Sequence, residues 1–148
     1  MAKVIIVYAS MTGNTEEIAE AIRDGVRKAG IEPEFKSAMD AKGAELLDYD
    51  VIIVGAYTWG DGDLPDEFLD FYEELDGLDL SGKKAAAFGS CDSSYSAYGA
   101  AVDTITAKFQ ELGADVVNEG LKIELNPSQD EKQLCSDLGE KLVAAVTS

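Results

Sequence analysis

Hydrophobic residues along the chain fall into two alternating patterns, short apolar runs and longer stretches with helical spacing. The apolar runs, which we expect to form strands, cover residues 3–8, 34–37, 51–57, 83–90 and 115–123. The stretches with helical spacing cover residues 15–28, 65–75, 102–112 and 128–146. Strands that alternate with amphipathic helices are typical of βα units, in which helices cover both faces of a parallel sheet. The pattern therefore predicts a doubly wound α/β fold with five strands.

Nothing in the composition divides the chain. It has 148 residues, of which 46% are hydrophobic, and it contains no linker, repeat or low-complexity stretch. We therefore expect residues 1–148 to form a single domain. No run reaches the ~18 apolar residues of a membrane span, and the N-terminal run is typical of a strand rather than a signal peptide. Cys91 and Cys135 do not have the spacing of a zinc or redox pair, which favours a reducing cytoplasm.

Charge and the absence of histidine exclude several classes of function. The chain has no histidine, which removes the usual general base, the His-activated nucleophiles and most transition-metal sites. The formal net charge is −17, so anionic membranes and nucleic acids would be repelled. This charge either serves solubility or steers the protein toward basic protein partners, and composition alone leaves both interpretations open.

Three polar loops follow the first, third and fourth predicted strands. Their sequences are SMTGNT (residues 10–15), TWGDGDLP (residues 58–65) and GSCDSSYSAYG (residues 89–99). Ligands of doubly wound sheets bind at the carboxyl ends of the strands, near the point where the winding reverses. We therefore expect these three loops to share one edge of the sheet and to form the functional site.

The first loop has two interpretations. Ser10, Thr12 and Thr15 offer hydroxyl groups, and Gly13 allows the backbone to turn its amides inward at the start of a helix. Such a loop can bind a phosphate without any cation. The alternative is that Thr12 or Asn14 simply caps the helix, which is the commoner use of these residue types.

The second and third loops both carry aromatic side chains. Trp59 directly follows the third strand and precedes an acidic, glycine-rich segment, where a large ring would be difficult to bury. Tyr95 lies among small polar residues in the third loop. Two aromatic rings beside a phosphate-binding loop indicate a binding site for a flat heteroaromatic ligand that carries a phosphate on a flexible tail.

In this order and at these spacings, SMTGNT, YTWGDGDLP and FGSCDSSY resemble the flavodoxins, specifically the short-chain members, over the whole length of the chain. The resemblance implies a flavodoxin-like sheet with strand order 2-1-3-4-5, non-covalently bound FMN, no metal and no catalytic residue. It places the 5′-phosphate at the first loop and at Thr58, and the isoalloxazine ring between Trp59 and Tyr95. Cys91 departs from the glycine that many members have there. The FMN-binding residues implied by the resemblance are Ser10, Met11, Thr12, Gly13, Asn14, Thr15, Thr58, Trp59, Gly60, Asp61, Ser90, Cys91, Asp92 and Tyr95.

The resemblance implies a low-potential one-electron carrier that shuttles between semiquinone and hydroquinone. Gly60 would present its carbonyl to flavin N5, and amides around Asp92 would meet N1 and O2. Nine acids and no base lie between Asp61 and Asp79, so the loops hold no cation that could neutralise a fully reduced ring. A cytoplasmic monomer is expected, with flavodoxin or ferredoxin reductases, oxidoreductases and haem proteins as basic partners.

Three other functions would require different features in these loops. A signalling receiver domain requires an acid pair after the first strand and an aspartate after the third, where this chain has Ser10-Met11 and Thr58-Trp59. A flavin-dependent reductase on the same fold would need a site for a nicotinamide nucleotide, and the three loops contain no basic residue to hold its phosphate. A flavin-free interaction module would use the two aromatic residues to bind a partner surface.

Overall fold

The strands and helices follow one another in the predicted alternation. The computed structural model describes residues 3–9, 13–57, 64, 66–91, 100–116, 121–124 and 127–147. The strands are β1 (Val4–Ala9), β2 (Glu34–Ser37), β3 (Val51–Ala56), β4 (Lys84–Cys91), β5 (Asp115–Val116) and β6 (Leu121–Glu124). The helices are α1 (Asn14–Lys28), α2 (Asp66–Glu74), α3 (Ala100–Glu111), α4 (Gln129–Thr147) and a short 3₁₀ helix, η1 (Gly43–Asp48).

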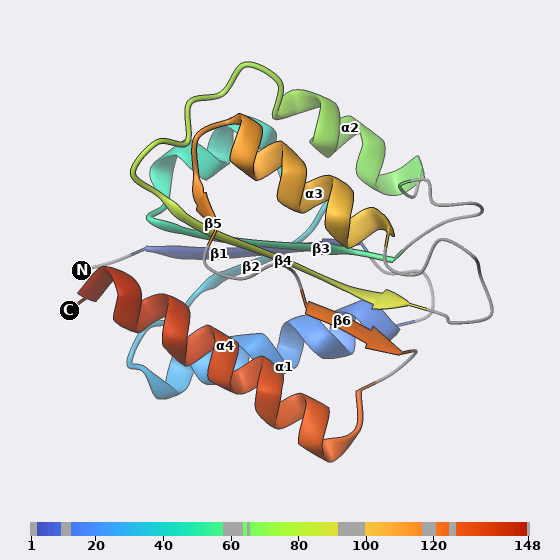
Figure 1. Cartoon of the computed structure of the whole chain (residues 1–148), viewed down its shortest axis with the longest axis vertical. Helices are drawn as coiled ribbons and strands as arrows, with labels where there is room; N and C mark the ends of the chain where they lie inside the picture. Colours follow the sequence, from blue (N-terminus) through green and yellow to red (C-terminus); the bar gives the residue numbers. More distant parts are fainter. Residues whose placement is uncertain are drawn as a thin grey trace.

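The strands form one parallel sheet in the order β2-β1-β3-β4-β5, with β6 also paired to β4. Helices α1 and α4 lie on one side of the sheet, and α2, α3 and η1 lie on the other (Figure 1). The doubly wound α/β architecture and its strand order are therefore confirmed. Helix η1 was not predicted, because its segment shows no sustained helical spacing of apolar residues.

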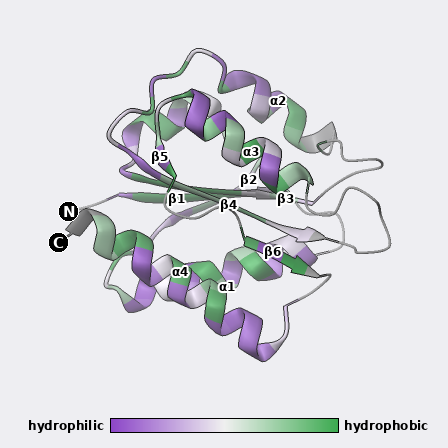
Figure 2. Ribbon diagram, in the orientation of Figure 1, coloured by the Kyte–Doolittle hydropathy of each residue, from purple (hydrophilic) through white to green (hydrophobic). Residues whose placement is uncertain are grey.

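Two hydrophobic cores, one on each face of the sheet, hold the layers together. Successive residues of a strand point to opposite faces, so Ile52 and Val54 of β3 contribute to one core and Ile53 to the other. Phe68 and Phe109 close the first core from α2 and α3, whereas α1 and α4 close the second. Figure 2 shows apolar colour on the central strands and on the inner sides of the helices. Burial on both faces explains why β3 is an uninterrupted apolar run rather than an alternating one.

The last predicted strand, residues 115–123, is divided in the structure into β5 and β6. β5 pairs Asp115 with Lys84, whereas β6 pairs Leu121 with Phe88. From β5 to β6, the outer strand therefore advances by two residues more than β4 does. An even shift keeps each side chain on its original face, so the hydrophobic pattern of residues 115–123 is compatible with the division. No helix among the described residues is both long enough and apolar enough to cross a bilayer.

Candidate functional site

The carboxyl ends of β1, β3 and β4 lie next to one another at one edge of the sheet. Ala9 of β1 pairs with Ala56 of β3, and Gly55 of β3 pairs with Phe88 of β4. The three predicted loops therefore begin side by side, as the sequence indicates. Nine of the predicted site residues lie outside the described residues. They are Ser10, Met11, Thr12, Thr58, Trp59, Gly60, Asp61, Asp92 and Tyr95.

The start of α1 has the geometry of an anion-binding helix terminus. Gly13 is the N-cap residue, and its φ of 91° lies in the left-handed region that favours glycine. The helix begins there, with the Glu17 amide donating to the Gly13 carbonyl at 3.0 Å. Because Gly13 has no side chain, it offers no side-chain cap to the amides of the first turn. Asn14 is the first helical residue rather than the cap, which excludes the capping interpretation for Asn14.

Two predicted site residues meet through their side chains. Thr15 lies in the first turn of α1 and Ser90 near the end of β4, and their hydroxyl oxygens are 2.9 Å apart. The exposed fraction is 1% for Thr15 and 9% for Ser90, so the hydrogen bond is shielded from water. It joins the first loop region to the third across 75 residues of sequence.

The two cysteines lie in different parts of the structure. Cys91 is the last residue of β4 and pairs with Glu124 of β6, at the edge that carries the candidate site. Cys135 is a free cysteine in α4, fully buried in the second core. Burial raises the pKa of its thiol to about 12, which keeps the thiol protonated and unreactive at neutral pH.

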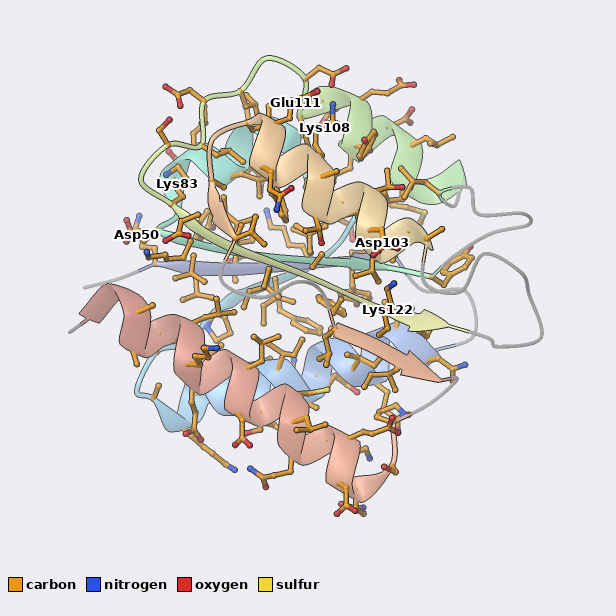
Figure 3. All side chains as sticks on the ribbon, in the orientation of Figure 1. Asp50, Lys83, Asp103, Lys108, Glu111 and Lys122 are labelled. Atoms are coloured by element: carbon orange, nitrogen blue, oxygen red, sulfur yellow. The ribbon has the colours of Figure 1, made fainter. Side chains whose placement is uncertain are left out.

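One cation near this edge was not identified from the sequence. Lys122 of β6 pairs in register with Gly89 of β4, close to the start of the third loop. Its Nζ lies 3.0 Å from Asp103 Oδ1 in the first turn of α3 (Figure 3). The loops themselves contain no base, but the sheet brings this lysine beside one of them and an aspartate balances it. No local signal could have shown this, because β6 and α3 meet only through the fold.

Burial and nearby carboxylates both act on the phenol of Tyr8 in β1. Tyr8, next to the carboxyl end of the strand, packs against Phe35 with a ring-centroid distance of 5.0 Å. Burial raises the pKa of the Tyr8 phenol, and the carboxylates of Glu16 and Glu20 raise it further. The helix terminus, to which Gly13 offers no side-chain cap, and the neutral hydroxyls of Thr15 and Ser90 fit a phosphate bound through hydrogen bonds rather than through an ion pair.

Comparisons with known proteins point to one family. The family model described as flavodoxin matches residues 6–139. The chain is 48% identical over 142 residues to probable flavodoxin 2 of Bacillus subtilis, covering 95% of this chain and 94% of the relative. It is 40% identical over 134 residues to the flavodoxin of Maridesulfovibrio salexigens, covering 88% and 92%. The crystal structure of oxidised Flavodoxin 1 from Bacillus cereus superimposes with a TM-score of 0.95 at 50% identity, covering 99% of this chain and 100% of that one.

Proposed function

The chain belongs to the flavodoxin family, and from this we infer that it is a low-potential one-electron carrier with non-covalently bound FMN. Membership makes it an FMN-binding electron-transfer protein that passes electrons to redox partners, and not an enzyme. A flavin-dependent reductase is not favoured, because the relatives named above are flavodoxins. The whole chain, residues 1–148, is proposed to act as a single flavodoxin-like domain.

The observation that carries the proposal is the meeting of α1 with the ends of β1, β3 and β4. The first turn, to which Gly13 offers no side-chain cap, supplies backbone amides, and the helix dipole favours a negative group there. Thr15 and Ser90 add neutral hydroxyl donors beside it. This donor set suits a monophosphate ester such as the tail of FMN. We assign the phosphate to Ser10, Met11, Thr12, Gly13, Asn14, Thr15 and Thr58.

The ring of FMN is assigned to the second and third loops. Trp59 and Tyr95 are proposed to stack on its two faces, and Gly60 to accept a hydrogen bond at N5. The remaining residues proposed to bind FMN are Asp61, Cys91 and Asp92, together with Ser90, which lies beside Thr15 at the phosphate end. The support for this placement is that these loops begin where β3 and β4 end, beside the phosphate end.

The low potential is attributed to the charge around the site. When bound, FMN supplies the one-electron chemistry, and the protein sets how readily a negative charge forms on it. The protein carries a net charge of −17, and Lys122, the described cation nearest the third loop in the sheet register, is paired with Asp103. An added electron is therefore poorly compensated, which makes the reduced carrier a strong donor.

The same charge indicates the kind of partner. Exposed acids of α2 and the turn that follows it include Asp70, Glu73, Asp76 and Asp79. We propose that such surfaces steer basic redox proteins toward the flavin, among them flavodoxin or ferredoxin reductases, oxidoreductases and haem proteins. A cytoplasmic monomer is proposed as the working form, and the buried free thiol of Cys135 is consistent with a reducing compartment.

The test combines a flavin titration with a pair of threonine variants. FMN added to the flavin-free protein should bind at one equivalent and show two separate one-electron potentials on reductive titration. Thr12→Ala should weaken FMN binding about ten-fold or more, the size of one lost hydrogen bond to a charged group. Thr106→Ala is the matched control, because the Thr106 hydroxyl donates to the Val102 carbonyl within α3, away from the strand ends.

Three results would contradict the proposal. Purified protein that does not bind FMN would exclude flavin function altogether. Oxidation of a nicotinamide nucleotide by the protein alone would favour the reductase. An electron-transfer rate with a basic partner that does not change with ionic strength would refute electrostatic steering.

A further inference from the structure

We propose that Ser90 is a positioning residue for the phosphate of FMN, acting through the Thr15 hydroxyl. In the bound state Ser90 Oγ–H donates to Thr15 Oγ1, and the Thr15 proton then points toward a phosphate oxygen. The inference rests on the proposed function, because it requires the phosphate to lie at the first turn of α1. It adds a role to Ser90 that acts on the phosphate rather than on the ring.

The direction of the hydrogen bond follows from a count of protons. Each hydroxyl has one proton to donate and two lone pairs with which to accept. The oxygens of Thr15 and Ser90 are 2.9 Å apart, so one proton lies between them and the other remains for an acceptor outside the pair. The positions of the two oxygens are compatible with either one as the donor. A phosphate dianion can only accept, so its binding selects the arrangement in which Thr15 donates outward and Ser90 donates to Thr15.

Burial makes this arrangement effective. Thr15 is 1% exposed and Ser90 9% exposed, so water cannot easily replace either partner. Hydrogen bonds polarise one another, and a hydroxyl that accepts one becomes a better donor in the next. Hydrogen bonds to a charged oxygen are about twice as strong as neutral ones, so orienting the Thr15 proton matters most for the phosphate.

The fold brings the two residues together in a way that suits this role. Thr15 is held by α1 and Ser90 by β4, the strand that pairs with both β3 and β6. Both oxygens are therefore carried by regular elements and not by a loop. A rigidly placed donor loses little entropy when the ligand arrives.

The experiment compares FMN with riboflavin, which has the same ring and no phosphate. Both dissociation constants are measured by fluorescence quenching with the full-length chain after its flavin has been removed. Ser90→Ala should weaken FMN binding about five- to ten-fold and leave riboflavin binding unchanged. Ser136→Ala is the matched control: Ser136 is another buried serine, 5% exposed, which lies on α4 and whose Oγ has no hydrogen-bond partner within the part of the chain that the structure describes. This control should change neither constant.

Two further variants separate positioning from a general structural effect. Ser90→Thr keeps the hydroxyl and should restore FMN affinity to within about two-fold of the wild type. Ser90→Cys keeps a side chain of similar size but offers only a weak donor, and it should show most of the five- to ten-fold loss of FMN affinity expected for Ser90→Ala. In a Thr15→Val background, Ser90→Ala should cause no additional loss, because its route to the phosphate is already removed.

Each other outcome has a defined meaning. The role of Ser90 would be overturned if the ratio of FMN to riboflavin affinity were unchanged in Ser90→Ala. It would also be overturned if Ser90→Ala caused its full loss of FMN affinity in the Thr15→Val background. If circular dichroism shows that Ser90→Ala does not fold, the FMN and riboflavin affinities of Ser90→Cys and Ser90→Thr decide the role of Ser90. If the wild type binds FMN no better than riboflavin, the phosphate site itself is refuted. If it binds neither flavin, the proposed function is refuted.

Discussion

Replacing Gly25 with alanine should destabilise the protein, although the same change stabilises most helices. Gly25 is buried in α1, where α1 packs against α4. A Cβ added at this position would lie 1.9 Å from the Ser136 carbonyl oxygen and 2.8 Å from Ser136 Cα. These are backbone atoms of α4, so no change of rotamer can relieve the contact.

The magnitude follows from two opposing effects. At an unobstructed helical position, alanine in place of glycine gains about 0.5–1 kcal/mol. Here the carbon and oxygen must separate by more than 1 Å to reach normal contact, so α1 and α4 must move apart along their shared interface. Overpacking of this kind costs about 1–3 kcal/mol and sometimes more, and the separated helices also lose dispersion contacts. We expect a net loss of about 2–3 kcal/mol in the free energy of unfolding.

Thermal and urea unfolding of the flavin-free protein measure this change. With about 2.1 cal/mol/K of unfolding entropy per residue, a chain of 148 residues should lose about 6–10 °C in Tm. Asp24→Ala is the control, because Asp24 is the exposed neighbour in the same helix and its replacement should change stability by less than about 0.5 kcal/mol. A Gly25→Ala protein as stable as the wild type would refute the argument, because α1 and α4 would then be free to separate at no cost.

Three further predictions concern the thiol, the cation near the site and the ion pairs that link α3 to the turn after α2. The folded pKa of Cys135, about 12, lies above its ordinary value of 9.0, so the buried neutral thiol contributes fully to stability below pH 9 and this contribution is lost as pH rises toward 12. Urea unfolding of the wild type should therefore show a free energy of unfolding about 1.4 kcal/mol lower at pH 10 than at pH 8, and Cys135→Ala should not show this difference. In a redox titration, Lys122→Gln should make the second one-electron potential of bound FMN more negative and Asp103→Asn should make it more positive, each by about 20 mV. Shifts of the same sign in the two variants would contradict the electrostatic account. Lys108 donates to Asp76 and to Glu111, so Lys108→Met should lower the free energy of unfolding at pH 7 by about 1 kcal/mol, and a chemical-denaturation midpoint equal to that of the wild type would show that the paired side chains contribute nothing.

Most strands and helices, and the edge of the sheet at which the three loops begin, could be predicted from the sequence. The run at β3 is apolar throughout, and only a strand buried on both faces has such a pattern when it is this short. Predicted boundaries of β1, β3 and α1 agree with the structure to within one residue at each end. Because parallel strands place their carboxyl ends at one edge, the order of the loops was enough to predict that they begin side by side.

Contacts between distant segments were decided only by the tertiary structure. The hydrogen bond between Thr15 and Ser90, the ion pair between Lys122 and Asp103, and the close approach of Gly25 to Ser136 each join residues from different elements. The two-residue register shift between β5 and β6, which both pair with β4, was likewise decided by the tertiary structure. Local patterns of apolar and polar residues determine which elements form and which face each one buries. They do not determine the register between strands or the distance between helices, because these depend on how side chains from separate parts of the chain fill the same space.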